Sequence, residues 1–285
     1  MADLVRLEQG IRDRLSEHES LVDALLQERE QIKGSLFSRF AACGKANCAC
    51  AQGEKHGPYY VLSKRSGGEG AFIYLKDEQV SRVIGAAGIG PETRVVAYDD
   101  QSGATAARLW YLLRAFGHDA VAVLDGGITK WQAEGRPLAT GTVTPEAARF
   151  TARLREGWVA GRDEMARLDP SILVIDARAG ERYRGETEPI DPRAGHIPGA
   201  VSLPFAGNLT DGAIPVFRPA EELRTRFVAA GADRRLPIVY CGSGVTACHD
   251  LLALHVAGLR GRLYGGSWSE WSADPSLPVA TGEKR

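Results

Sequence analysis

The sequence predicts an α/β protein whose parallel sheets are flanked by helices and occur in two copies, the first of them truncated. A long helix and a small β-hairpin unit are expected before them. Short β-branched runs, typical of buried strands, occur at 94–98, 121–124, 172–176 and 237–240. Helical stretches separate them at 104–116, 220–230 and 247–254, and such alternation is typical of parallel sheets covered on both faces. In addition, residues 97–141 repeat as residues 239–282.

Composition excludes several classes of protein. A chain of 285 residues with 44% hydrophobic and 25% charged residues is long enough for two globular domains and is not a disordered tail. It has no apolar run near the roughly 18 residues that span a bilayer and no secretory signal, so we expect a cytoplasmic protein with no membrane partner. A net charge of -1 excludes strong global attraction to nucleic acid, and five cysteines, an odd number, do not describe a disulfide framework.

Residues 1–33 have the pattern of an amphipathic helix. Apolar side chains recur at helical spacings, with Glu and Arg between them. These apolar positions are Leu4, Leu7, Ile11, Leu15, Val22, Leu25 and Ile32. Such a stripe must be covered, so the helix either packs on its own chain or forms a homodimer with a second copy.

Residues 34–79 are predicted to form a small cysteine-rich unit. Two β-rich runs at 59–63 and 71–75 flank Ser-Gly-Gly at 66–68, which predicts a β-hairpin. Four side chains offer soft metal ligands, namely Cys43, Cys48, Cys50 and His56. Two ligands separated by one residue are awkward for zinc and no second CxxC pair is present, so we expect no metal and keep a zinc site as the less favoured alternative. Residues 33–65 hold six Lys or Arg against one Glu, which leaves nucleic-acid binding as a less favoured alternative. The run 34–63 resembles a small bacterial domain of unknown function.

The internal repeat assigns different parts to its two copies. Residues 103–106 match 244–247, and Trp131 matches Trp271. At the position aligned with Cys241 the first copy carries Asp100, so thiol chemistry belongs to the second copy. The front half of the second copy has no counterpart before residue 80. We therefore expect a truncated, non-catalytic copy at 80–145, covered in part by the N-terminal segments or by a partner chain, and a catalytic copy at 146–285.

Cys241 lies where a predicted strand runs into a predicted helix. The residues from 241 to 247 are Cys-Gly-Ser-Gly-Val-Thr-Ala, and the two glycines let the loop curl so that successive backbone N–H groups point inward. These N–H groups and the helix N-terminus stabilise a thiolate, which makes Cys241 a predicted nucleophile. A cysteine phosphatase would need an arginine where Ala247 stands, so the loop favours a sulfur group held as a persulfide.

Five ordered motifs lie between residues 176 and 271. They are Asp-Ala-Arg at 176–178, Arg-Tyr-Arg-Gly at 182–185, Gly-His-Ile-Pro-Gly-Ala at 195–200, the cysteine loop at 241–247 and Gly-Ser-Trp-Ser-Glu-Trp at 266–271. Over about residues 80–282 the chain resembles the tandem-domain rhodanese-like sulfurtransferases, which include thiosulfate and 3-mercaptopyruvate sulfurtransferases. The resemblance implies rhodanese-like sheets in both copies, an inactive first copy and a catalytic second copy.

The same resemblance implies a site and a reaction. Cys241 would be catalytic and would pass sulfur, without a cofactor, from a small-molecule donor to a thiol or cyanide acceptor. The substrate-binding positions would be Arg182, Gly242, Ser243, Gly244, Val245 and Thr246, with Arg182 on the donor's anionic group. The loop looks like the 3-mercaptopyruvate type, because Ser243 suits proton handling and no cationic side chain follows the cysteine. The alternative is a non-catalytic regulatory protein that carries sulfur or binds nucleic acid or a partner through its cysteine-rich unit.

Several polar residues near these motifs have simpler interpretations. His196 is expected to fix a turn by hydrogen bonding rather than to act as a base. Asp176 and Arg178 are expected to pair and hold the fold. Arg184 is either a second anion ligand or a solvated helix residue, and Cys248 is expected in the core.

Overall fold

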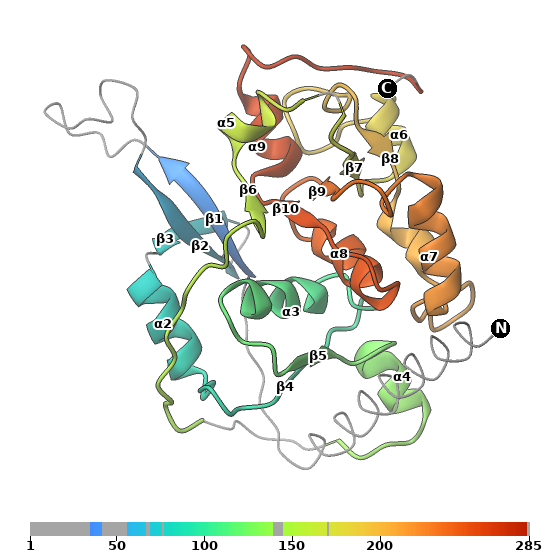
Figure 1. The fold of residues 1–285 in the computed structure, drawn as a ribbon. Coiled ribbons are helices and arrows are strands. Elements are labelled where there is room, and N and C mark those ends of the chain that lie inside the picture. The colour runs from blue at the N-terminus through green and yellow to red at the C-terminus, as the bar shows by residue number, and fades with distance from the viewer. Residues whose placement is uncertain are drawn as a thin grey trace, which may run out of the picture.

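The computed structural model describes residues 35–41, 56–66, 69–75, 77–138, 145–169 and 171–283, with residues before 80 described by their backbone. Within these ranges the strands form three sheets (Figure 1). Two of them are parallel and belong to the repeat, and helices cover them. The predicted α/β class with flanking helices is therefore confirmed.

The N-terminal sheet is antiparallel and three-stranded. Its order is β1 (Ser35–Ala41), β2 (His56–Ser66) and β3 (Glu69–Leu75). The β2–β3 pair confirms the predicted hairpin, with Ser63 opposite Phe72. The sequence did not predict β1, because Leu36 and Phe37 are adjacent and break the alternation typical of a half-buried strand. Residues 1–34 and the three cysteines at 43, 48 and 50 lie outside the described residues, so the predicted helix, the homodimer and the lack of a metal stay predictions.

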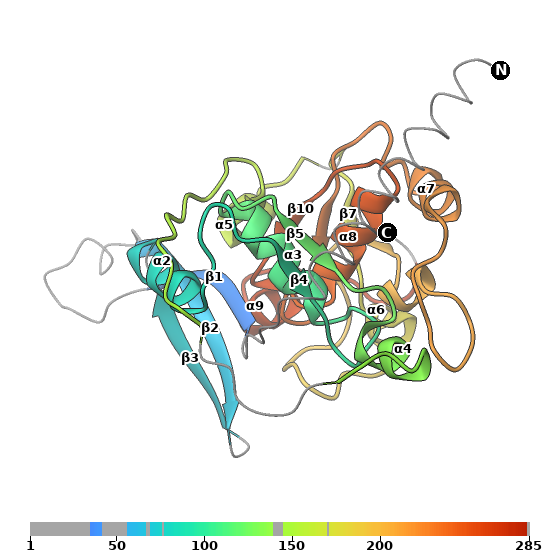
Figure 2. The same ribbon diagram turned by 90° about the horizontal axis from the view of Figure 1, so that it is seen from below.

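The first copy of the repeat holds a two-stranded sheet. Its elements are α2 (Asp77–Ala86), β4 (Val95–Ala97), α3 (Ala106–Ala115), β5 (Val121–Val123) and α4 (Gly127–Ala133). Strands β4 and β5 pair in parallel, and within the described residues no other strand joins them, as expected of a truncated copy. Strand β1 lies against α3 and β3 against α2, which Figure 2 shows from below. The N-terminal segment thus covers part of the first copy, as predicted.

The second copy holds a five-stranded parallel sheet in the order β6-β10-β9-β7-β8. Its strands are β6 (Val159–Ala160), β7 (Val174–Asp176), β8 (Val201–Ser202), β9 (Ile238–Tyr240) and β10 (Arg262–Tyr264). Its helices are α5 (Arg162–Met165), α6 (Gly180–Arg184), the 3-10 helix η2 (Phe205–Asn208), α7 (Ala220–Ala229), α8 (Ala247–Val256) and α9 (Ser267–Ala273). The predicted runs at 172–176 and 237–240 became β7 and β9.

The two copies share the hydrophobic core on the α8 side of the five-stranded sheet. Side chains alternate across β9, so Val239 and Cys241 face α8 while Ile238 and Tyr240 face the core on the other side of the sheet. Helices α3 and α8 contact each other between the two parallel sheets (Figure 1). The core on the α8 face continues through Leu113 of α3 into the first copy. The truncated sheet therefore packs on α3, and the other side of α3 packs on α8 of the second copy.

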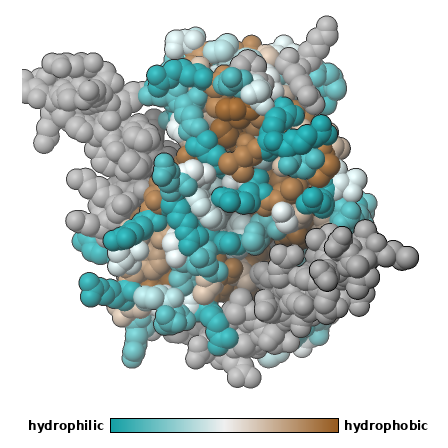
Figure 3. Space-filling model, viewed as in Figure 1, coloured by the Kyte–Doolittle hydropathy of each residue, from teal (hydrophilic) through white to brown (hydrophobic). Residues whose placement is uncertain are grey.

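The surface is mixed. On the face seen in Figure 3, hydrophilic side chains are spread over the molecule with hydrophobic groups between them. None of the described helices combines the length and the apolar character needed to cross a lipid bilayer.

Candidate active site

Strand β9 carries Cys241 to the carboxyl edge of the five-stranded sheet. Residues 241–246, which we call the cradle loop, join β9 to α8, and Cys241 is only 2% exposed. The loop is tied to the start of α9 by two backbone hydrogen bonds. The carbonyl of Cys241 accepts from the Trp268 N–H at 2.9 Å, and that of Gly242 accepts from the Ser269 N–H at 2.9 Å. The cysteine is thus held in a fixed position at a parallel sheet edge where ligands commonly bind.

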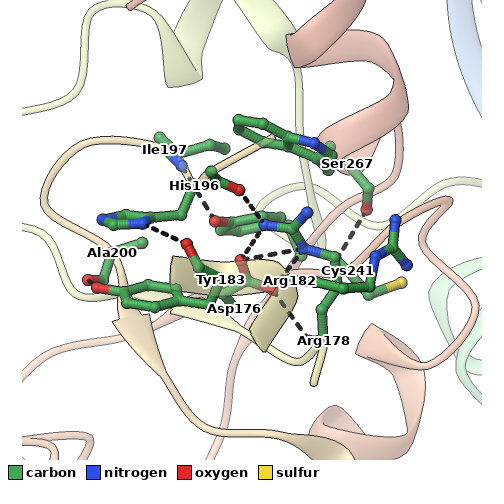
Figure 4. A network of polar contacts seen from close by, with 12 residues as sticks. Asp176, Arg178, Arg182, Tyr183, His196, Ile197, Ala200, Cys241 and Ser267 are labelled. Carbon is green, nitrogen blue, oxygen red and sulfur yellow. Dashed lines mark hydrogen bonds and ion pairs between the residues drawn. The ribbon is translucent and has the colours of Figure 1, made fainter. Parts of the chain in front are cut away.

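Ser267 fixes the base of the cradle loop from α9. It is fully buried and has a φ of +54°, a left-handed conformation that is strained for a residue with a side chain. Its Oγ accepts from the Cys241 N–H at 3.1 Å (Figure 4). The same Oγ donates to the Tyr264 carbonyl at 2.9 Å. The sequence placed Ser267 in a motif but gave no signal of this contact.

Gly244 allows the cradle loop to curl. Its φ is +73°, and a Cβ there would lie 2.6 Å from the Gly265 carbonyl oxygen. Both facts require glycine, which agrees with the predicted reason for the Gly-x-Gly pattern.

The corresponding loop of the first copy shows what this backbone binds. The Asp99 carboxylate accepts hydrogen bonds from the N–H groups of Gln101 at 2.9 Å and of Gly103, Thr105 and Ala106 at 2.8 Å each. An anion is therefore held by four convergent amides at a helix N-terminus. The sequence paired Asp100 with Cys241 as a simple replacement, whereas the group that fills this cradle is Asp99, one residue earlier.

In the second copy the equivalent loop carries a cysteine, Cys241, instead of a carboxylate. The repeat places the N–H groups of residues 242, 244, 246 and 247 where the first copy binds Asp99. Cys241 occupies the position of Asp99, because the Ile128 N–H donates to the Asp99 carbonyl at 2.9 Å just as the Trp268 N–H donates to the Cys241 carbonyl at 2.9 Å. In the described part of the chain, no carboxylate takes the place of Asp99. The cradle loop can therefore receive the thiolate of Cys241 or a persulfide built on it.

Arg182 extends from α6 over the cradle loop. Its Nη1 lies 3.5 Å from the point where a Cβ of Gly242 would be, and Figure 4 shows its side chain beside Cys241. Its Nη2 donates to Glu188 Oε1 at 2.6 Å and to Asp191 Oδ2 at 3.2 Å. Burial acts to raise the pKa of Glu188, but the Arg182 guanidinium and two backbone amides outweigh it and hold that pKa below its usual range. Two buried carboxylates thus neutralise this cation, which the sequence did not predict.

A buried polar frame adjoins Arg182, because Glu188 pairs with both Arg178 at 3.2 Å and Arg182 at 2.6 Å. The predicted pair is confirmed, because Arg178 Nη2 lies 2.6 Å from Asp176 Oδ2 with both side chains buried. Arg178 Nη2 also donates to the Gly195 carbonyl at 2.7 Å. His196 Nδ1 lies 2.7 Å from the Tyr183 carbonyl, so its predicted function in fixing a turn is confirmed.

The alternatives for Arg184 and Cys248 are decided by their contacts. Arg184 pairs with the exposed Glu186 at 2.7 Å and is a surface residue rather than a ligand at the loop. Cys248 is buried in the core as predicted, and its Sγ lies 3.3 Å from the Gly244 carbonyl oxygen. Burial raises the pKa of Cys248 to about 12, so this thiol stays protonated and is a poor nucleophile.

A buried polar cluster joins α8 to the first copy. The Asn208 amide donates to Asp250 Oδ1 at 2.6 Å and contacts His249 Nδ1 at 3.2 Å. Burial lowers the pKa of His249 to about 4, so the ring is neutral and its Nε2 donates to the Ser102 carbonyl at 3.2 Å. Burial also raises the pKa of Asp250 to about 7, although the nearby Arg226 opposes that shift.

Ionisation of Asp250 is expected to destabilise the fold as the pH rises. Its pKa is raised from 3.8 in the unfolded chain to about 7, so its favourable contribution is complete below about pH 4 and is lost through pH 7. We expect Asp250→Asn, which keeps an oxygen acceptor for Asn208, to gain about 1–3 kcal/mol of stability at pH 8. The gain at pH 5 should be smaller. Thermal melting at the two pH values measures this, and an equal or lower melting temperature at pH 8 contradicts it.

Comparison with protein families agrees with this geometry. A model of the rhodanese-like domain matches residues 61–134 and 162–274. The chain belongs to the rhodanese-like family. A second model, described as a domain of unknown function (DUF6788), matches residues 5–84. This match includes the predicted helix as well as the cysteine-rich unit, and the first rhodanese-like match begins within β2.

Individual members of the rhodanese-like family support the predicted class of activity. The chain is 45% identical over 212 residues to a Pseudomonas aeruginosa protein named "Probable 3-mercaptopyruvate sulfurtransferase", covering 69% of this chain and 70% of that one. It is 36% identical over 211 residues to the thiosulfate sulfurtransferase of Bos taurus, with 70% of each covered. A structure of 3-mercaptopyruvate sulfurtransferase from Leishmania major superposes with a TM-score of 0.60 at 32% identity. That match covers 69% of this chain and 56% of the other, so the chain spans a little over half of that solved structure.

Proposed function

We propose that this protein is a sulfurtransferase that carries sulfur on Cys241, as a persulfide, from 3-mercaptopyruvate or thiosulfate to a thiol or to cyanide. The cradle loop carries the proposal, because the same backbone in the first copy binds a carboxylate through four amides. The names of the family relatives support this chemistry over the alternative of a non-catalytic nucleic-acid or partner-binding protein.

The reaction divides into two displacements on sulfur. In the first, the Cys241 thiolate attacks the sulfur that is to be transferred, which is the outer sulfur of thiosulfate or the thiol sulfur of 3-mercaptopyruvate. A sulfur–sulfur bond forms to Cys241 as the bond from that sulfur to the rest of the donor breaks. Thiosulfate then leaves as sulfite, while 3-mercaptopyruvate leaves as the enolate of pyruvate, which takes up the thiol proton. In the second, cyanide or a thiolate attacks the outer sulfur and restores the Cys241 thiolate. The charge on the carried sulfur remains a single negative charge, which the amides of the cradle loop can hold throughout.

Residues around the cradle loop have distinct functions in this proposal. The amides of Gly242, Gly244 and Thr246 bind the sulfur anion, with Val245 completing the curl. Arg182 orients the donor's anionic end through Nη1, which faces the loop. Ser243 is exposed at the loop mouth, where its hydroxyl can pass a proton to the leaving enolate.

Mass spectrometry of the untreated and donor-treated protein tests the proposal. After incubation with 3-mercaptopyruvate or thiosulfate, the peptide containing Cys241 should gain about 32 Da, the mass of one sulfur atom, and cyanide should remove it as thiocyanate. Failure to find the adduct with either donor, or an adduct that cyanide does not discharge, would reject the proposal.

Asp191 is expected to tune the choice of donor. It pairs with Arg182 at 3.2 Å and is nearly buried, so it reduces the positive charge available to an incoming anion. We expect Asp191→Asn to raise kcat/KM for thiosulfate about three- to tenfold and to raise it less for 3-mercaptopyruvate, because thiosulfate has two negative charges. Steady-state kinetics with both donors at low salt measure the ratio.

Glu186→Gln is the matched control for that substitution. Glu186 is a carboxylate of the same segment, but it pairs with the surface residue Arg184 rather than with Arg182. It should leave the donor ratio unchanged. If both variants change the ratio equally, general surface charge and not the Arg182 pair sets the preference.

A further inference from the structure

A buried arginine of the non-catalytic copy lies behind the cradle loop. Arg108 is on α3, and its side chain is 1% exposed. Its Nη1 donates to the Gly244 carbonyl and lies 3.4 Å from the Ser243 carbonyl oxygen. A Cβ on Gly244 would be 3.1 Å from the same nitrogen. The first copy therefore contacts the two central peptide units of the catalytic loop.

This contact fixes the direction of two loop amides. In a trans peptide unit the C=O and the following N–H point in opposite directions. Because Arg108 holds the carbonyls of Ser243 and Gly244, the N–H groups of Gly244 and Val245 must point away from the guanidinium. The Gly244 N–H is one of the cradle amides, and its counterpart in the first copy, the Gly103 N–H, donates to the Asp99 carboxylate at 2.8 Å. Hydrogen bonding of a carbonyl to a cation also polarises its peptide unit and strengthens the N–H as a donor.

The guanidinium also places a buried positive charge against the loop that begins at Cys241. Burial lowers the pKa of Arg108, and negative charge on Cys248 or Cys241 acts in the opposite direction. Cys248 is not a source of that charge, since burial holds its own pKa near 12. A persulfide carried on Cys241 would bring a negative charge to the loop whose carbonyls this buried cation binds.

We propose that Arg108 is a positioning residue for sulfur transfer, which orients the amides of the cradle loop and stabilises the anionic sulfur on Cys241 from the non-catalytic copy. The proposal rests on the function proposed for Cys241. It gives the truncated copy a direct part in the active site, because α3 is retained in that copy and contacts α8.

The rate of alkylation of Cys241 by iodoacetamide as a function of pH, followed on the Cys241 peptide by mass spectrometry, tests the proposal. We expect Arg108→Met to react about tenfold more slowly than the unmodified protein at pH 7 and at a similar rate at pH 10. Arg108→Lys retains the charge but not the two-carbonyl contact, so it should regain most of the pH 7 rate. In turnover, both variants should lower kcat more than they change KM for the donor.

Arg114→Met is the matched control. Arg114 is on the same helix and at the same junction, but it bonds to His255 and Asp119 rather than to the loop. Its alkylation profile should equal that of the unmodified protein. An alkylation profile of Arg108→Met that equals that of the unmodified protein overturns the proposal. If Arg108→Met does not fold, the proposal is overturned when Arg108→Lys shows both an unchanged alkylation profile and an unchanged kcat. If the unmodified protein forms no persulfide, the proposed function fails, while the alkylation profiles still decide whether Arg108 acts on Cys241.

Discussion

Replacement of Cys241 by serine is expected to lower thiocyanate formation at least about a thousandfold with either donor. A serine hydroxyl is not ionised at neutral pH and cannot form the persulfide, although the cradle loop around it is unchanged. The two backbone anchors of the loop to α9 involve main-chain atoms and should persist. We therefore expect the melting temperature of Cys241→Ser to stay within about 2 °C of the unmodified protein. Thiocyanate formation and thermal melting, measured on the same preparation, check both statements.

Cys248 is an internal control for the Cys241→Ser experiment. It lies seven residues after Cys241, but it is fully buried and its thiol stays protonated. In Cys241→Ser treated with donor, the peptide containing Cys248 should gain no sulfur. Sulfur on Cys248, together with residual turnover, would mean that the loop does not select the nucleophile and would contradict the assignment of Cys241.

The local chemistry of the cradle loop was predictable from the sequence. Cys241, Gly242 and Gly244 are neighbours, and a strand, a Gly-x-Gly turn and a helix in direct succession determine where their amides point. The buried strands and their helices were predictable for a similar reason, since apolar runs and turn residues are local signals. The ends of the strands differ from the predicted runs by one or two residues.

Contacts between distant segments were not predictable. Arg108 is 135 residues from Ser243, and Ser267 is 26 residues from Cys241. An arginine in an apolar helix and a serine after a glycine carry no local signal of these contacts. The strained φ of Ser267 depends on the packing of α9 and cannot be inferred from a residue that normally avoids that conformation.

The repeat also shows a limit of residue-by-residue alignment. The sequence paired Asp100 with Cys241, but the anion in the first cradle is the side chain of Asp99. The backbone determines where the amides converge, and any side chain that reaches that point can fill it. The equivalent backbone hydrogen bonds of Asp99 to Ile128 and of Cys241 to Trp268 put Asp99 at the position of Cys241, so Asp100 is the extra residue of the first copy.

Substitution of Gly244 by alanine is expected to lower kcat about a hundredfold, because one added methyl group displaces the cradle loop. The new Cβ would lie 2.6 Å from the Gly265 carbonyl oxygen and 3.1 Å from Arg108 Nη1. The oxygen belongs to the backbone before α9 and cannot rotate away, so the cradle loop must move. Its N–H groups then no longer point at the sulfur. Steady-state turnover and the yield of the persulfide on Cys241 measure the effect.

Gly157→Ala separates this displacement from backbone strain alone. Gly157 has the same φ of +73° as Gly244, but a Cβ there meets nothing within 4 Å. Both variants should lose about 1 kcal/mol of stability from the left-handed conformation. Only Gly244→Ala should lose turnover, since only there does the added carbon meet the cradle. A Gly244→Ala variant that retains kcat within about threefold of the Gly157→Ala variant would show that the amide geometry of the loop does not limit the transfer of sulfur.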